Sequence, residues 1–129
     1  MGTLLHLAMR TDWLDALEDG AYRRSTRGAW VEDVGFVHAS TSRQLTGVGD
    51  AFYGDVPVED LVLLVIDEGA LAQAGVPVRW DDVDGELFPH IGGAVPVDAV
   101  VATRDVSRAG DRLALPDLAG LDVVTGPPD

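Results

Sequence analysis

The sequence predicts an α+β domain built around a mixed or antiparallel sheet. Apolar residues at helical spacing are confined to the first half of the chain, as in Trp13–Leu17 and Leu45–Phe52, whereas short strand-like apolar runs predominate later. No internal repeat and no linker divides the 129 residues. We therefore expect one domain over residues 1–115. Because the last residues lack an apolar pattern, we expect a flexible tail over residues 116–129.

The N-terminal region predicts a strand followed by a helix. Residues 3–8 are short and apolar, and alternation along them places His6 on one face of the strand. Thr11 or Asp12 then caps a helix that ends at Gly20.

A loop, a second strand and a second helix are expected next. Residues 22–34 are rich in Arg, Ser and Gly, which is typical of a loop, and a strand is predicted over 36–40. Thr41 followed by Gln44 has the spacing of a capping box, which predicts the start of the second helix. Alternation places three side chains of the strand on one face: Phe36, His38 and Ser40.

The second half of the chain predicts strands separated by turns. Residues 61–67 form a continuous apolar run, typical of a central strand covered on both faces. One helical turn is expected over 70–74, and an acidic turn over 81–85. The remaining predicted elements are a strand at 78–80, a strand at 97–103, and a hairpin over 105–115 that turns near Gly110.

The composition excludes several classes of function. The chain has no cysteine and no lysine, which excludes disulfides, zinc–thiolate sites, cysteine nucleophiles and Schiff-base chemistry. A net charge of −13 argues against nucleic acid as a partner. The longest apolar run, Leu61–Ile66, is too short to cross a membrane, and no signal peptide is visible, so we expect a cytoplasmic protein. The sequence indicates no oligomeric state.

Three of the nine arginines lie close together in sequence: Arg23, Arg24 and Arg27. Such a cluster on an acidic protein is able to bind an anion through bidentate hydrogen bonds. The alternative is a solvated loop that balances nearby carboxylates, and we favour that interpretation for Arg24 and Arg27.

Two of the three histidines lie where chemistry is expected. His38 and Ser40 stand where a strand meets a helix, and free backbone N–H groups there favour an anion. A histidine and hydroxyl groups at such a junction are able to hold a ribose, phosphate or carboxylate group. Alternatively, Ser40 or Thr41 caps the helix and His38 bonds a neighbouring carbonyl. His6 gains significance if its strand neighbours the strand that carries His38.

Glu86 and His90 are four residues apart, but Pro89 argues against a helix and therefore against a helical metal-binding pair. With no HExxH spacing present, we expect no metal site. Glu86 is a candidate general base or a stabiliser of developing positive charge, the alternative being one more surface acid.

Two ordered motifs carry a family resemblance. Gly35-Phe36-Val37-His38-Ala39-Ser40 and Glu86-Leu87-Phe88-Pro89-His90-Ile91 resemble the GF(I/V)HxS and ELFPHxYG elements of the bacterial domain-of-unknown-function family 952. The resemblance covers residues 3–104. Gly92-Gly93 stands where the family commonly shows Tyr-Gly, so an aromatic side chain is missing here.

The family is similar to the ADP-ribosyltransferase-like superfamily, which includes RNA 2′-phosphotransferases. That similarity implies a small, split, mostly antiparallel sheet with two short helices and NAD bound as a substrate in its cleft. It implies the catalytic residues His6, His38 and Glu86, and the NAD-binding residues Tyr22, Arg23, Ser40 and Thr41.

We therefore expect a small-molecule ligand in a cleft and, as the leading hypothesis, an NAD-using transferase or glycosidase. Glu86 would stabilise the oxocarbenium-like cation, and His6 and His38 would face one another across adjacent strands. His90 is expected to be a structural part of its Pro-Gly turn. The alternatives are a non-catalytic module that binds a small anionic or nucleotide-derived metabolite, and a structural or interaction domain.

Overall fold

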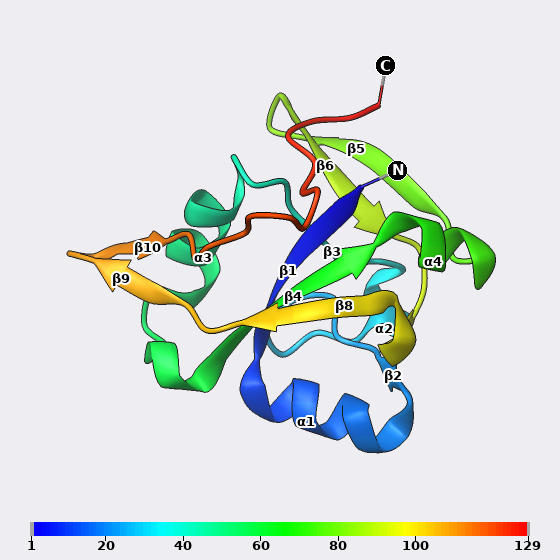
Figure 1. The fold of residues 1–129 in the computed structure, drawn as a ribbon, viewed down its shortest axis with the longest axis horizontal. Helices are drawn as coiled ribbons and strands as arrows, with labels where there is room; N and C mark the ends of the chain where they lie inside the picture. The colour runs from blue at the N-terminus through cyan, green and yellow to red at the C-terminus, as the bar shows by residue number, and fades with distance from the viewer. Residues whose placement is uncertain (1, 129) are drawn as a thin grey trace.

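The computed structural model describes residues 2–128 and has an α+β fold with mostly antiparallel strands, as predicted (Figure 1). Its two largest sheets each contain three strands. The central sheet has the order β1 (Thr3–Met9), β4 (Leu61–Asp67) and β8 (Val100–Arg104). The second sheet has the order β3 (Val37–His38), β6 (Glu86–Ile91) and β5 (Val78–Val83).

The other elements are short. Two small sheets pair β2 (Ala21–Tyr22) with β7 (Val95–Pro96), and β9 (Ser107–Ala109) with β10 (Arg112–Ala114). The helices are α1 (Arg10–Asp19), α2 (Val31–Val34), α3 (Leu45–Tyr53) and α4 (Glu68–Gln73), with 3-10 turns η1 (Val58–Asp60) and η2 (Val97–Ala99).

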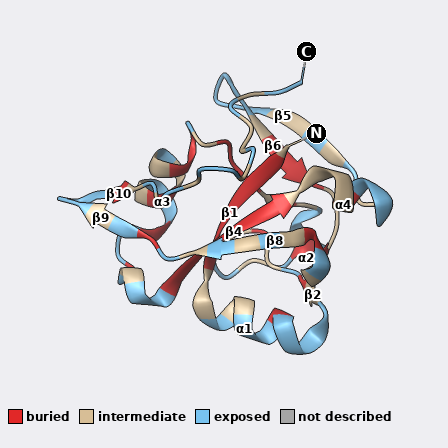
Figure 2. Cartoon of the chain, viewed as in Figure 1, coloured by how far each residue is buried: buried red, intermediate tan, exposed pale blue. Residues whose placement is uncertain are grey.

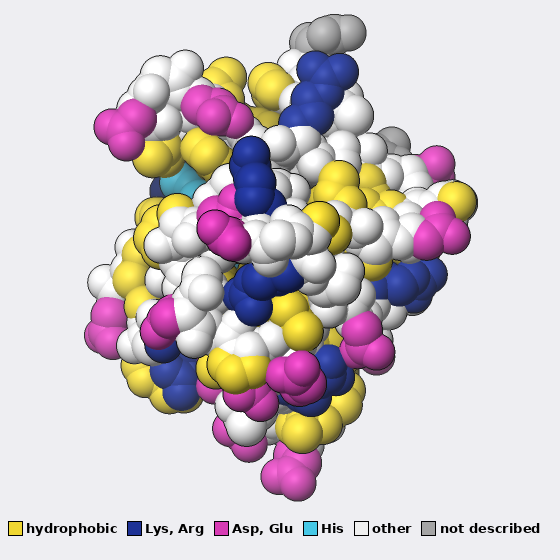
Figure 3. Space-filling view, turned by 90° about the vertical axis from the view of Figure 1, so that its left-hand side faces the viewer, with side chains coloured by type: hydrophobic (Ala, Val, Ile, Leu, Met, Phe, Trp, Pro, Cys, Tyr) yellow, Lys and Arg dark blue, Asp and Glu magenta, His cyan; other side chains and the backbone are white. Residues whose placement is uncertain are grey.

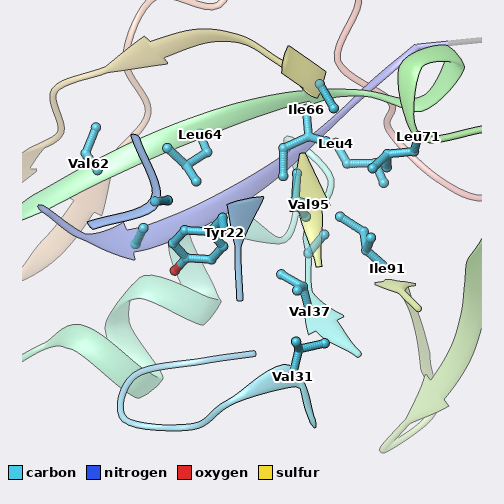
Figure 4. Close-up of a cluster of buried hydrophobic side chains, with 14 residues drawn as sticks. Leu4, Tyr22, Val31, Val37, Val62, Leu64, Ile66, Leu71, Ile91 and Val95 are labelled. Carbon is cyan, nitrogen blue, oxygen red and sulfur yellow. The ribbon is translucent and has the colours of Figure 1, made fainter. Parts of the chain in front are cut away.

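Alternation along the central strands divides the core into two clusters. Leu4 and Leu64 lie in one cluster and Leu5 and Leu63 in the other, and all four side chains are fully buried. Buried residues follow β1 and β4 along the middle of the molecule (Figure 2). The first cluster also encloses Tyr22 (Figure 4). The strands therefore bury both faces, as the continuous apolar run of β4 predicted.

The acidic turn predicted over 81–85 is present but shorter than expected, because the chain turns in only two residues. Asp84 and Gly85 both have positive φ, at 54° and 89°, as a tight hairpin turn requires. Strand β5 consequently extends through the acidic residues, and β6 begins at Glu86, where no strand was predicted. This hairpin brings Asp81 and His90 to the same sheet.

The helices depart from the prediction in part. Among the described residues, α1, α3 and α4 correspond to the two predicted helices and to the helical turn expected over 70–74, whereas α2 lies in the predicted loop. The second predicted helix begins at Leu45, and only half of the capping box forms. The Thr41 backbone N–H donates to Gln44 Oε1 at 3.1 Å, whereas the buried Thr41 hydroxyl has no hydrogen-bond partner. The strand predicted over 97–103 begins at Val100, after η2.

Two isolated bridges join β1 to segments outside the sheets, one just after β3 and one near the C-terminus. Leu5 and Ser40 exchange both backbone hydrogen bonds, at 2.9 and 2.7 Å, which fixes the chain after β3 beside β1. Thr3 forms a parallel bridge with Val123, so part of the segment 116–129 packs against the domain. The flexibility expected for that segment stays a prediction.

Candidate functional site

A cleft of about 570 Å³ lies between α3 and the β5–β6 hairpin. Its lining combines an imidazole, two carboxylates, two guanidinium groups and aromatic rings. Figure 3 shows histidine atoms in a recess on this side of the molecule. The charged and aromatic lining residues include His38, Glu86, Arg43, Arg112, Phe52 and Phe88.

His38 heads a chain of three side chains that runs away from the cleft. Its Nδ1 lies 3.2 Å from Nε2 of His90, which faces it directly across the β3–β6 pair. Nδ1 of His90 lies 2.7 Å from Oδ2 of Asp81. His90 is only 4% exposed and stacks on Phe36, with ring centroids 3.9 Å apart. The imidazole next to His38 is therefore that of His90, and the expected side-by-side pairing of the His6 and His38 rings is wrong.

Electrostatics favours a neutral His38 and an ionised Asp81. Burial, and secondarily repulsion from His90, lowers the pKa of His38 to about 4. The hydrogen bond from His90 lowers the pKa of Asp81. Within residues 2–128, Nδ1 of His38 is bonded to His90, Nε2 makes no hydrogen bond to the protein, and the His38 side chain lines the cleft.

His6 lies behind His38 and supports its backbone. Its Nδ1–H donates to the His38 carbonyl at 2.6 Å, and its Nε2 accepts the Tyr22 hydroxyl at 2.8 Å. Burial lowers the pKa of His6 to about 4, although the bond to that carbonyl opposes the shift. Both ring nitrogens are occupied and the side chain is 3% exposed, so His6 reaches the cleft only through His38.

Glu86 is held at the cleft by a single amide. Gln44 Nε2 donates to Glu86 Oε2 at 2.9 Å and to the Leu87 carbonyl at 2.7 Å. Because the oxygen of the same amide accepts from Thr41, the junction before α3 and the start of β6 are tied together. The structure thus brings Glu86 and His38 to one cleft, as the sequence suggested.

The remaining predicted site residues lie elsewhere. Tyr22 is 1% exposed in the first core cluster, and Ser40 and Thr41 are buried at the junction that follows β3. Arg23 lines a different cavity beside α1, where it lies near Asp19 and Glu32. Their NAD-binding roles stay predictions.

Sequence reasoning missed the parts played by His90, Asp81 and Gln44. His90 stands in the second motif but was expected to be structural, and Asp81 was assigned to a turn. The available signal was Asp84-Gly85, because a two-residue turn there extends both strands and pairs them. Gln44 was identified as half of a capping box, but its side chain also bonds Glu86 and Leu87, which are distant in sequence.

Residues 2–128 contain neither a metal-ligand cluster nor a membrane-spanning helix. No group of three or more His, Asp or Glu side chains is placed to hold a metal ion. No helix there is long and apolar enough to cross a membrane.

Comparison with solved structures gives the same fold. The crystal structure of protein CC0527 from Caulobacter crescentus matches with a TM-score of 0.70 and 23% identity, covering 90% of this chain and 94% of that one. The solution NMR structure of CC0527 matches with a TM-score of 0.66 and 23% identity, over 88% and 91% of the two chains. No curated protein matches the sequence. The model of the family "Protein of unknown function (DUF952)" matches residues 7–103, and the chain therefore belongs to that family.

Proposed function

We propose that the cleft binds NAD as a substrate and that His38 and Glu86 catalyse transfer of its ADP-ribosyl group to a hydroxyl acceptor or to water. The observation that carries the proposal is the joint placement of an unpaired imidazole nitrogen and a held carboxylate in one cleft. A volume of about 570 Å³ is within the range of roughly 300–1,000 Å³ that is typical of small-molecule sites.

The lining offers partners for both the phosphate groups and the aromatic rings of a nucleotide-derived ligand. Arg43 supplies a guanidinium group for phosphate oxygens, and Arg112 supplies a second one whose Nε already donates to Asp50 Oδ2 at 3.2 Å. Phe52 and Phe88 offer aromatic faces for a base or a nicotinamide ring. These groups support NAD, which the resemblance to ADP-ribosyltransferases also implies.

The proposed reaction divides the work between two side chains. The N-glycosidic bond of NAD breaks and its electron pair leaves with neutral nicotinamide, while the Glu86 carboxylate stabilises the oxocarbenium-like cation. The acceptor oxygen then bonds to C1′ of the ribose, and its proton passes to Nε2 of His38. His6 and Tyr22 support this arrangement from behind by holding the His38 backbone.

The first test is calorimetric titration of the intact protein with NAD, ADP-ribose and nicotinamide. We expect NAD to bind to the wild type and to bind more weakly to His38→Ala. The absence of any heat of binding with NAD would refute the proposal.

The second test measures release of nicotinamide from NAD. Glu86→Gln should retain NAD binding within a few-fold and lose turnover by about 100-fold or more, since the amide cannot stabilise a cation. Glu59→Gln makes the same change at an exposed site outside the cleft and serves as the control. Binding without turnover by the wild type would favour the alternative, a module that binds a nucleotide-derived metabolite.

A further inference from the structure

We infer that Asp81 and His90 form a proton relay behind His38, which fixes Nε2 of His38 as the proton-accepting atom of the cleft. The chain of contacts from Asp81 Oδ2 to His90 Nδ1, and from His90 Nε2 to His38 Nδ1, spans 2.7 and 3.2 Å. The inference rests on the proposed function for its use, but the relay itself is a property of the folded protein.

The hydrogen-bond directions follow from the Asp81 carboxylate. An ionised carboxylate only accepts, so Nδ1 of His90 carries the hydrogen and donates to it. In neutral His90, Nε2 is then an acceptor, and the hydrogen between the two rings belongs to Nδ1 of His38. Nε2 of neutral His38 is consequently left with a lone pair, at the cleft.

Uptake of one proton is expected to shift a second proton along the chain. Nε2 of His38 binds the proton from the cleft, and Nδ1 of His38 passes its own proton to Nε2 of His90. His38 ends as the opposite neutral tautomer, and His90 becomes an imidazolium paired with Asp81. The positive charge thus moves from beside the substrate to a position next to a carboxylate, where it is more stable.

Packing around the relay holds its geometry. The stacked Phe36 ring and the 4% exposure of His90 restrict its rotation. Because His90 is hydrogen-bonded to His38, both it and Asp81 are positioning residues. The other titratable or charged groups near this chain are Arg79 beside Asp81, His6 on the His38 carbonyl, and Glu86, Asp84, Arg43 and Arg112 around the cleft.

The direct test is NMR of the histidine ring nitrogens, which distinguishes a protonated nitrogen from a bare one. The chain has only three histidines, so single His→Gln variants suffice for assignment. At about pH 8 we expect His38 to be protonated at Nδ1 and bare at Nε2. As the pH falls, His38 should change to the Nε2-protonated tautomer at the same pH at which His90 becomes doubly protonated.

Asp81→Asn removes the charge and keeps a side-chain oxygen that accepts from His90. The coupled change of tautomer should disappear or move to lower pH, because the His90 imidazolium loses its carboxylate partner. Asp82→Asn makes the identical substitution one residue away, and it should leave the coupling unchanged. The Asp82 carboxylate accepts the Gly85 N–H at 2.8 Å and makes no hydrogen bond to His90 among the described residues. His90→Gln is a second variant whose amide accepts from His38 but relays no proton.

Nicotinamide release extends the test to catalysis. Asp81→Asn should lower kcat/KM by at least about tenfold and shift the acidic limb of its pH profile to lower pH, whereas Asp82→Asn should do neither. A His38 that becomes doubly protonated while His90 stays neutral, or an Asp81→Asn variant with wild-type coupling, would overturn the relay. A coupled change of tautomer in a protein that never cleaves NAD would confirm the relay and refute the proposed function.

Discussion

The buried His6 should make the stability of the protein depend on pH. In the folded state burial lowers the pKa of His6 to about 4, whereas the unfolded chain has the ordinary histidine value of 6.5. Between these two values the unfolded state binds a proton that the folded state does not. Stability is therefore complete above pH 6.5 and is lost as the pH falls toward 4.

The size of the effect follows from the two pKa values. The free energy of unfolding should fall by about 1.4 kcal/mol per pH unit from His6 alone, and by about 3 kcal/mol in all at pH 4. His38 also has a lowered pKa and acts in the same direction, by a smaller amount because its ring is partly exposed to water. Such a loss is a large fraction of the stability of a small domain.

Urea unfolding followed by tryptophan fluorescence measures this dependence. His6→Gln removes one titrating group, so its free energy of unfolding should fall less steeply with decreasing pH than that of the wild type. The two slopes should differ by about 1.4 kcal/mol per pH unit between about pH 6.5 and 4.5. The urea m-value should be the same for both proteins, which checks that the folded and unfolded states are comparable. Parallel pH dependences for wild type and His6→Gln would refute the reasoning.

Three other substitutions test the packing around the site by chemical denaturation. Gly49→Ala should destabilise the protein by about 1 kcal/mol. The new Cβ would collide with the Leu113 side chain, and the cost of that clash exceeds the free energy gained from the higher helix propensity of alanine. Gly47→Ala, on the same helix but with open space at its Cβ, should stabilise by about 0.5 kcal/mol, and equal shifts for the two variants would contradict this packing. Tyr22→Phe should cost about 1–3 kcal/mol, because it leaves buried Nε2 of His6 without a donor, and an unchanged midpoint would argue against that bond.

The central sheet was predictable because its strands carry their own signal. The run Leu61–Ile66 is apolar on both faces, and both faces are covered by the two core clusters. The C-terminal hairpin was predictable from Gly110, which adopts a positive φ of 64° between β9 and β10. In both cases the decisive residues are neighbours in sequence.

The β5–β6 hairpin was missed because local preference and tertiary pairing disagree there. Asp81 and Asp82 are poor strand formers, and Pro89 lacks the N–H that a strand normally donates. Pairing decides the outcome, since Pro89 lies opposite Trp80 and its carbonyl accepts the Ala39 N–H at 3.0 Å. The proline lies opposite the residue that follows β3, where the strand has ended, and its carbonyl still accepts a hydrogen bond there.

The placement of His38 and Glu86 on one cleft was anticipated, whereas the partner of His38 was not. His6 was expected to be that partner, and the Leu5–Ser40 bridge does set its strand beside the end of β3. The ring of His6, however, bonds the His38 carbonyl and not its imidazole. Which side of a backbone a neighbouring ring approaches depends on packing that alternation alone does not specify.

The geometry of the relay depends on strand register, and the two-residue turn sets that register. With Asp84 and Gly85 as the turn, Arg79 lies opposite His90, and Asp81 lies on the same face one diagonal step away, within reach of its Nδ1. A slip of one residue between β5 and β6 would turn Asp81 to the opposite face, because side chains alternate along a strand. The acidic segment that looked like a loop is therefore the element that aligns a carboxylate with His90 and, through it, sets the direction of the hydrogen bond at His38.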